Sequence, residues 1–280
     1  MPRVAFATCQ AFPQGYPDDL LAYPPCRARG IEPVPAIWDD PSVDWSGFDA
    51  VLLRTTWDYY KHAPAFLQWL DSLPCPVWNP PGIVRWNASK TYLFDLEAWG
   101  VPIVPTVRFA PPEDLAGTLA AKGWKEAVVK PVVSAGAWRT WRVRPDNAEA
   151  VGAEVHALGG LWLLQPFVFE ILTKGEWSLL FFGGEPSHSL RKVPAEADFR
   201  VQEEFGGRVL PERAPERVWD VGRAALQAVG ETLPYARIDV VDSAAGPWLV
   251  EAELIEPEVF LRADPGAPER FAAALHAALG

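Results

Sequence analysis

The chain has 280 residues, of which 49% are hydrophobic and 22% are charged, so it is a foldable globular chain and not a disordered one. Its net charge is −11 and its isoelectric point is near 4.9, which argues against a general nucleic-acid binder. An acidic protein can still bind phosphates through a local cluster of cations or backbone N–H groups.

The first 85 residues alternate between predicted strands and helices, as a small parallel-sheet domain does. The elements expected here are strands over 2–9, 30–40 and 48–60 and a helix over 63–73. A second helix is expected over 19–30, but Pro24 and Pro25 lie inside it. Because proline in a helix interior costs about 3 kcal/mol or more, this helix is predicted to be broken or to start late.

The rest of the chain predicts two further groups of elements. The first group consists of helices over 87–100, 112–123 and 146–159 and strands over 101–109, 126–133 and 140–145. Asn87 or Ser89 is expected to cap the helix over 87–100, and Gly100 to end it. The second group consists of a strand over 162–171, hairpins over 176–193 and 235–254, and helices over 216–233 and 267–279. Gly183-Gly184 marks the turn of the first hairpin, since both glycines accept a positive φ.

Cysteine and histidine usage argues against disulfides and against a histidine or cysteine metal site. Cys9, Cys26 and Cys75 are odd in number and widely spaced, which predicts reduced thiols. The four histidines form no local metal-ligand motif. There is neither a signal-peptide pattern nor a run of about 18 apolar residues, so we expect a soluble cytoplasmic protein with no membrane partner.

A group of three carboxylates is predicted on the second hairpin. In "WLVEAELIEP", residues 248–257, apolar side chains alternate with Glu251 and Glu253, and Asp239 lies in the partner strand. All three positions are odd-numbered, so a register with an even sum would place them on one face. Such a face suits Mg²⁺, which prefers oxygen ligands. The alternative is a solvated edge strand, where glutamates are common.

Cations that could hold phosphate oxygens occur upstream of these carboxylates. Lys130 lies in "EAVVKPVV" and is followed by the small residues Ser134, Ala135, Gly136 and Ala137, a reasonable phosphate cradle. The alternative is a lysine that snorkels from a strand end. Lys90 is expected near a helix start. Neither a G-x-x-x-x-G-K-[ST] loop nor a G-x-G-x-x-G after a strand occurs, which excludes those two nucleotide-binding fingerprints.

Taken in chain order, these features resemble the ATP-grasp superfamily. The features are Lys90, "VVKP" with its small-residue loop, "LLQPFV", and Asp239 before "EAE". The resemblance covers about residues 86–262. It is greatest to the glutathione synthetase and ribosomal-protein glutamate ligase branch, and within that branch to the cyclo-ligase group of the D-cycloserine pathway. "LLRTTWDYY" and "GEWSLLFFGGEPSHSLRKVPAEADFRVQEEFGG" resemble this narrower group.

The resemblance implies an α/β fold of the α+β ATP-grasp kind. It implies a Rossmann-like pre-ATP-grasp domain over 1–85 on the substrate side, followed by a two-lobed ATP-grasp domain. The small lobe, or lid, would cover 86–163, and the large lobe with the magnesium site 164–280.

The resemblance also implies a set of site residues, with ATP and Mg²⁺ as cofactors. The residues matched to ATP are Lys90, Lys130, Ser134, Ala135, Gly136, Gln165, Phe167, Val168 and Glu176. The residues matched to magnesium are Asp239, Glu251 and Glu253, the last of which is more often asparagine in the family. Arg200, Arg237 and Lys192 are the expected catalytic cations near the phosphoryl and acyl groups. Gln202 stands where many relatives have asparagine.

The implied chemistry is ATP-dependent ligation through an acyl phosphate, between molecules or within one molecule. The substrate would be a small carboxylate and amine compound resembling an amino acid, with O-ureido-D-serine the nearest candidate. Arg54, Thr55 and Asp58 in "RTTWD" are hypothesised to hold it, because a carboxylate needs a cation and Arg54 ends an apolar strand. An exposed arginine at a strand end is the equally weighted alternative.

Two other functions remain open at this point. One is a small-molecule kinase on the same fold, and the other is a nucleotide-binding module without turnover. Fourteen tryptophans include some expected at the surface, where they could line a pocket or a dimer interface, so a homodimer is also left open.

Overall fold

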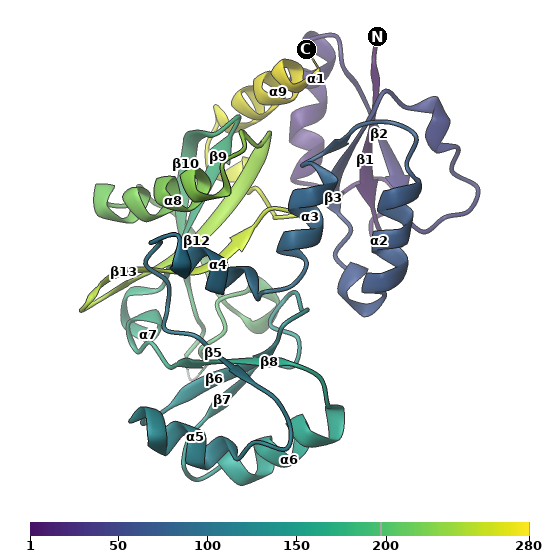
Figure 1. The fold of residues 1–280 in the computed structure, drawn as a ribbon. Helices are drawn as coiled ribbons and strands as arrows, with labels where there is room; N and C mark the ends of the chain where they lie inside the picture. The colour runs from purple at the N-terminus through teal and green to yellow at the C-terminus, as the bar shows by residue number, and fades with distance from the viewer. Residues whose placement is uncertain (197, 280) are drawn as a thin grey trace.

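Three β-sheets follow one another along the chain, as Figure 1 shows. The structure is a computed structural model that describes residues 1–196 and 198–279. None of its helices, within the part of the chain that it describes, is long and apolar enough to cross a membrane.

The N-terminal sheet is parallel, with strand order β2-β1-β3-β4. Its strands are β1 (Arg3–Thr8), β2 (Glu32–Ile37), β3 (Ala50–Thr55) and β4 (Val77–Trp78). β3 is buried along its whole length, as a strand is when both faces of its sheet are covered. α2 (Ala63–Ser72) covers one face, and α1 (Tyr23–Ala28) covers the other. α1 begins after a 3₁₀ turn (Asp19–Ala22), with Pro24 and Pro25 in its first turn, so the predicted late start is confirmed.

The helix predicted over 87–100 is confirmed only from Tyr92 to Ala98, with Gly100 just beyond its end, and a separate short helix precedes it. The two helices are α3 (Pro81–Asn87) and α4 (Tyr92–Ala98). Asn87 caps neither of them: its side chain donates to the carbonyl of Ala252 and accepts from the N–H of Leu254. The N–H of Lys90 donates to the carbonyl of Val132, 2.6 Å away. These tertiary bonds hold the link between the helices out of helical geometry and place Lys90 beside the C-terminal sheet.

The middle sheet is antiparallel, with strand order β5-β8-β6-β7. Its strands are β5 (Val107–Phe109), β6 (Ala127–Pro131), β7 (Trp141–Val143) and β8 (Trp162–Pro166). α5 (Leu115–Lys122) and α6 (Ala148–Leu158) lie together against it at the bottom of Figure 1. The strand expected over 162–171 ends at Pro166, which has no N–H to extend the ladder, and the short α7 (Glu170–Lys174) follows.

The C-terminal sheet is antiparallel, with strand order β11-β10-β9-β12-β13. Its strands are β9 (Glu176–Phe182), β10 (Glu185–Val193), β11 (Arg208–Pro211), β12 (Tyr235–Ser243) and β13 (Gly246–Glu253). Both predicted hairpins, β9-β10 and β12-β13, are confirmed. Gly183 (φ 61°) and Gly184 (φ 81°) form the first turn in the left-handed region, as their sequence predicts.

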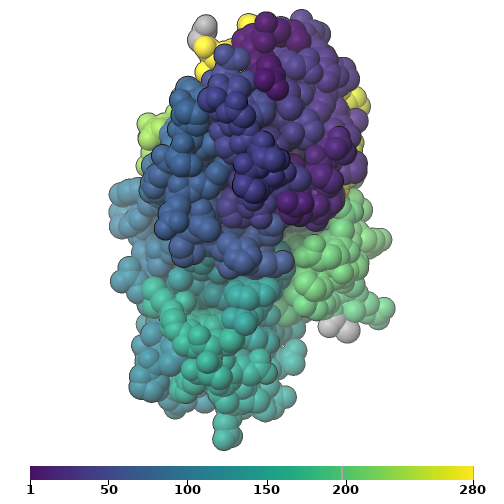
Figure 2. Space-filling model, turned by 90° about the vertical axis from the view of Figure 1, so that its right-hand side faces the viewer, coloured from purple at the N-terminus to yellow at the C-terminus, as the bar shows by residue number. Residues whose placement is uncertain are grey.

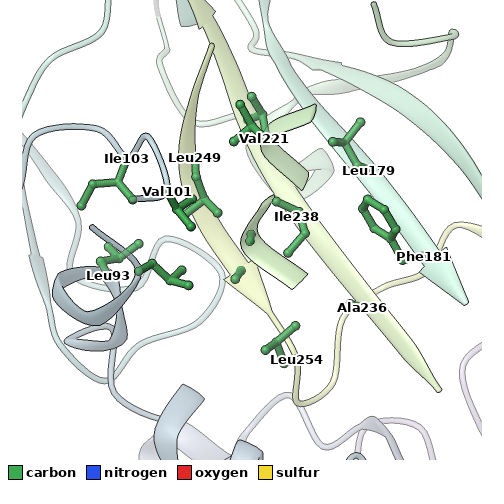
Figure 3. Packing of buried hydrophobic residues seen from close by; sticks show 14 of the residues in the cluster. Leu93, Val101, Ile103, Leu179, Phe181, Val221, Ala236, Ile238, Leu249 and Leu254 are labelled. Atoms are coloured by element: carbon green, nitrogen blue, oxygen red, sulfur yellow. The ribbon is translucent and has the colours of Figure 1, made fainter. Parts of the chain in front are cut away.

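Two hydrophobic cores cover the faces of the C-terminal sheet. On one face, α4 and α8 (Glu216–Val229) pack against β9, β12 and β13, and Figure 3 shows Leu93, Leu179, Ile238 and Leu249 meeting there. On the other face, α9 (Ala267–Ala278) packs between this sheet and α1. The second core therefore joins the N-terminal sheet to the C-terminal sheet. In Figure 2 the purple and blue N-terminal residues lie directly above the teal residues of the middle sheet.

Candidate active site

A cavity of about 520 Å³ lies where the three sheets converge. Its wall includes parts of β6, β8, β9, β10, β12 and β13, together with loops of the N-terminal domain. All but three of the predicted site residues line it: Lys90, Lys130, Ser134, Ala135, Gly136, Gln165, Phe167, Val168, Glu176, Lys192, Arg200, Arg237, Asp239, Glu251 and Glu253. The fold therefore brings residues 163 positions apart into one wall, although their individual roles stay predictions.

The three predicted magnesium ligands lie on one face of the β12-β13 pair. Asp239 is opposite Glu251, and Arg237 is opposite Glu253, so the register has the even sum that the sequence required. β13 is an edge strand, yet Glu251 and Glu253 are only partly exposed and face the cavity. The solvated-edge alternative is therefore wrong.

Each of these carboxylates has a cation partner. Lys90 donates to Glu251, and Arg237 donates to Glu253 and to Asp239. The Nζ of Lys192 lies 3.0 Å from Asp239 and 2.6 Å from Glu176. Burial alone would raise the pKa of Asp239, but Arg237 and Lys192 outweigh burial and hold that pKa at about 2. Asp239 is therefore an anion at neutral pH.

The electrostatics differ between the two glutamates of β13. Burial raises the pKa of Glu253 to about 7. Burial also disfavours the charged form of Glu251, but Lys90 and Lys130 outweigh it and lower the pKa of Glu251 below its usual value. The two lysines thus favour a charged carboxylate at Glu251.

The carboxylates fit a hard divalent cation in chemistry but do not converge on one point. Within residues 1–196 and 198–279, no group of three or more acidic, histidine or cysteine side chains is arranged as a metal site. Asp239, Glu251 and Glu253 supply only oxygen ligands, which is what Mg²⁺ prefers. Binding Mg²⁺ would require them to leave Lys90, Lys192 and Arg237, and those cations would then be free for phosphate oxygens.

Lys130 differs from the other cations of the cavity, because no carboxylate in the described chain pairs with it. It is 7% exposed and lies on β6, next to Pro131 and the Ser134–Gly136 loop. Burial lowers its pKa to about 8. A phosphate group placed in the cavity would supply the missing partner. The snorkelling alternative is wrong, since the side chain is enclosed and does not reach solvent.

The segment after Lys130 has a backbone suited to close approach. Gly136 (φ 56°), Ala137 (φ 55°) and Arg139 (φ 52°) all have left-handed backbone conformations, which residues other than glycine rarely adopt. A Cβ on Gly136 would come within 3.1 Å of Glu204, so the loop meets the 198–206 segment across the cavity. Backbone N–H groups in successive turns of this kind can approach an anion closely.

Gln165 and Phe167, which the resemblance matches to ATP, are positioned by partners of their own, and so is the predicted catalytic Arg200. Gln165 on β8 donates to the hydroxyl of Thr106, 2.8 Å away. The Arg142 guanidinium lies 3.7 Å from the ring centre of Phe167, and Arg142 itself is held by Glu126. Arg200 is half-buried, paired with Asp198 at 2.8 Å, and stacks on Phe205. The sequence analysis missed Asp198, which holds one of the predicted catalytic cations.

Arg54, Thr55 and Asp58 do not line the cavity, which corrects the hypothesis that they hold the substrate. Arg54 is 1% exposed and binds Asp19 at 2.8 Å, so it is not the exposed arginine of the alternative either. Thr55 is buried against Thr8, and Asp58 accepts from the indole N–H of Trp38. The reason is that partners within the N-terminal domain, Asp19 and Thr8, hold the side chains of Arg54 and Thr55.

We expect Arg54→Leu to lower the free energy of unfolding by about 3 to 5 kcal/mol, because it leaves the Asp19 carboxylate buried without its cation. Urea unfolding followed by circular dichroism measures this change. Arg27→Ala, which breaks an exposed pair with Glu32, is the matched control and should leave the unfolding midpoint unchanged. A decrease for Arg54→Leu no larger than that of the control would contradict the assignment.

An aromatic wall closes the end of the cavity that belongs to the N-terminal domain. Phe12, Tyr16 and Trp57 line the cavity and contact one another edge to face, with ring centres 4.8 to 5.5 Å apart. Trp57 was not predicted as a site residue, although its neighbours Thr55 and Asp58 were. Glu256 and Glu258 were not predicted either, yet both lie in the cavity wall. No local sequence pattern could have found them.

The comparisons with known proteins agree with this architecture. Residues 4–79 match the family described as the D-cycloserine synthetase DcsG N-terminal domain. The cycloserine biosynthesis protein DcsG of Streptomyces lavendulae is 34% identical over 89% of this chain and 90% of its own. The crystal structure of D-cycloserine synthetase DcsG superposes with a TM-score of 0.88 and 32% identity, covering 99% of this chain and all of that one.

A more distant solved structure shows the same fold. The D-alanine–D-alanine ligase of Bacillus anthracis complexed with ATP superposes with a TM-score of 0.69 at 16% identity, covering all of both chains. The predicted ATP-grasp fold is thereby confirmed. The identity and coverage shared with DcsG also show the family: this chain belongs to the DcsG family of ATP-grasp proteins and is an ATP-dependent ligase that forms C–N bonds on a small substrate.

Proposed function

We propose that the protein uses ATP and Mg²⁺ to activate the carboxylate of a small amino-acid-like substrate as an acyl phosphate, which an amine then attacks. The observation that carries this proposal is the cavity wall itself. It holds a buried lysine without a carboxylate partner, Lys130, within the same enclosure as three carboxylates on paired strands. A phosphate group would pair with Lys130, and a divalent cation would bind the three carboxylates.

In the first step, an oxygen of the substrate carboxylate attacks the γ-phosphorus of ATP and ADP leaves. Lys90 and Lys130 hold non-bridging phosphate oxygens, and Arg237 and Arg200 neutralise charge on the transferred phosphoryl group. Asp239, Glu251 and Glu253 would hold Mg²⁺, which would supply positive charge to neutralise the phosphates. Ser134, Ala135 and Gly136 close over the phosphates and exclude water, which would otherwise hydrolyse the acyl phosphate.

In the second step, the amine nitrogen attacks the acyl carbon and the phosphate leaves with the proton of the amine. Gln165, Phe167, Val168 and Glu176 hold the nucleoside, although Glu176 must release Lys192 to reach a ribose hydroxyl. Lys192, released by Glu176 and by Asp239, would then hold the transferred phosphate.

The substrate is proposed to carry its carboxylate and its nitrogen nucleophile in one molecule, so that the reaction closes a ring. The relative named for cycloserine biosynthesis supports this choice, because its likeness extends over the N-terminal aromatic wall. O-ureido-D-serine is the first compound to test.

The proposal is tested by measuring ADP release with MgATP across a panel of amino acids that includes O-ureido-D-serine, with and without hydroxylamine. We expect one amino acid to stimulate ADP release at least tenfold and hydroxylamine to trap it as a hydroxamate. Because only an acyl phosphate yields a hydroxamate, ADP release with no hydroxamate and a phosphorylated hydroxyl product would establish the kinase instead. ATP binding without any release would establish a binding module.

A further inference from the structure

Among the described residues of the cavity wall, Glu204 and Glu256 are the carboxylates without a cation partner. Glu176, Glu203, Asp239, Glu251, Glu253 and Glu258 each lie within ion-pair distance of a lysine or arginine. Of the two without one, Glu204 is exposed to solvent. Glu256 is only partly exposed, and no lysine, arginine or histidine in the described part of the chain pairs with its carboxylate.

The backbone at Glu256 is fixed by the N-terminal domain. The indole N–H of Trp57 donates to the carbonyl of Glu256 at 2.9 Å. Arg54 donates to the carbonyl of the next residue, Pro257, at 3.0 Å. Two consecutive carbonyls are therefore held by two residues of the "RTTWD" stretch. That stretch does not supply a substrate ligand itself, but it sets the position of Glu256 at the end of the cavity beside the aromatic wall.

The surroundings of Glu256 favour binding of a positively charged ligand group. Burial, with added repulsion from Glu253, raises the pKa of Glu256 to about 8, so a free anion is costly there. A cation beside it would remove that cost. Tyr16 and Trp57 present aromatic rings to the same end of the cavity, and such rings attract organic cations. The phosphate-binding lysines lie on β6 and before α4, on other parts of the wall.

We propose that Glu256 is a specificity-determining residue that binds the ammonium group of the amino-acid substrate, with Tyr16 and Trp57 forming the wall beside it. This inference rests on the proposed function and narrows it: the substrate class is amino acids with a free amino group. N-acylated and des-amino carboxylates are rejected because they leave Glu256 buried without a partner. The Mg²⁺ ligands remain Asp239, Glu251 and Glu253.

The test compares the wild type, Glu256→Gln, Glu256→Asp and the control Glu204→Gln, which makes the same change at an exposed position of the wall. The KM for the amino acid, the KM for MgATP and the Mg²⁺ dependence are measured for each. We expect Glu256→Gln to raise the KM for the amino acid by about 10- to 100-fold, the size of a lost charged hydrogen bond. The KM for MgATP and the Mg²⁺ dependence should change less than twofold, and Glu256→Asp should recover part of the affinity.

A second readout does not need turnover. Titration calorimetry measures binding of the amino-acid panel, and of the N-acetyl derivatives, to protein saturated with Mg²⁺ and a non-hydrolysable ATP analogue. We expect acetylation to weaken binding to the wild type at least tenfold and to leave binding to Glu256→Gln unchanged.

Three results would overturn the inference. They are an unchanged KM in Glu256→Gln, a change confined to the Mg²⁺ dependence, or equal binding of acetylated and free amino acids. A wild type that binds free amino acids but shows no ADP release would instead defeat the proposed function and leave the ammonium site standing.

Discussion

Lys130→Met is expected to lower kcat/KM for ATP turnover by a factor of at least about 10³ while leaving the protein as stable as the wild type or more stable. Among the described residues, Lys130 is the cation of the cavity without an ion-pair partner. It favours the charged form of Glu251, but we expect this contribution to be smaller than the cost of burying Lys130 itself. Its pKa of about 8, against 10.5 for a free lysine, means that the charged form costs the folded state about 3 kcal/mol. Methionine keeps the length of the side chain and removes that cost.

The stability side of this prediction has a pH signature. The folded pKa of Lys130 lies below the unfolded one, so between about pH 8 and 10.5 the unfolded chain binds more protons. The free energy of unfolding of the wild type should therefore rise with pH through this window relative to that of Lys130→Met. Below pH 8 the difference between the two proteins should be constant, with the variant the more stable.

Urea unfolding at several pH values, together with calorimetry of ATP binding, measures both effects. Lys122→Met, a substitution on the exposed end of α5, is the control and should change neither. A Lys130→Met protein that is clearly less stable than the wild type would show that the lysine has a structural partner and would remove the main support for a phosphate at this point.

The parts of the structure that the sequence predicts well are those set by local periodicity. Both hairpins follow from alternation and from Gly183-Gly184. The even register of Asp239 with Glu251 follows from the same period of two, and that register brings the carboxylates to one face. Lys130 follows from its contrast with an apolar strand. In each case neighbours in sequence determine where the side chain points.

The parts that the sequence could not predict depend on contacts between distant segments. The helix expected over 87–100 begins only at Tyr92, because Asn87 bonds to β13 and Lys90 to the loop after β6, and neither partner is visible locally. Arg54 was mispredicted for the same reason. An arginine at the end of a strand suggests a substrate ligand, and only the folded chain shows that Asp19 is its partner. Glu256 matters because it lacks a partner, and only the folded chain shows which carboxylates are paired.

Lys192→Met is expected to destabilise the protein, whereas Lys130→Met is not, although both substitutions remove a buried lysine from the same cavity wall. Lys192 lies between Glu176 and Asp239, and its loss leaves Glu176 buried without a cation and Asp239 with Arg237 alone. We expect the free energy of unfolding to fall by about 3 to 5 kcal/mol, and activity to be lost as well. Urea unfolding measures this, with Lys130→Met as the matched comparison.

A second substitution tests whether the destabilisation of Lys192→Met comes from buried charge or from a packing defect. Glu176→Gln in the Lys192→Met background removes the carboxylate that has lost its cation, so it should restore part of the lost stability without restoring activity. If the double variant is less stable than Lys192→Met, the destabilisation does not come from the buried charge. Lys130 and Lys192 would then differ in their effect on stability for another reason. The assignment of Lys192 to stabilising the fold and of Lys130 to binding phosphate would be wrong.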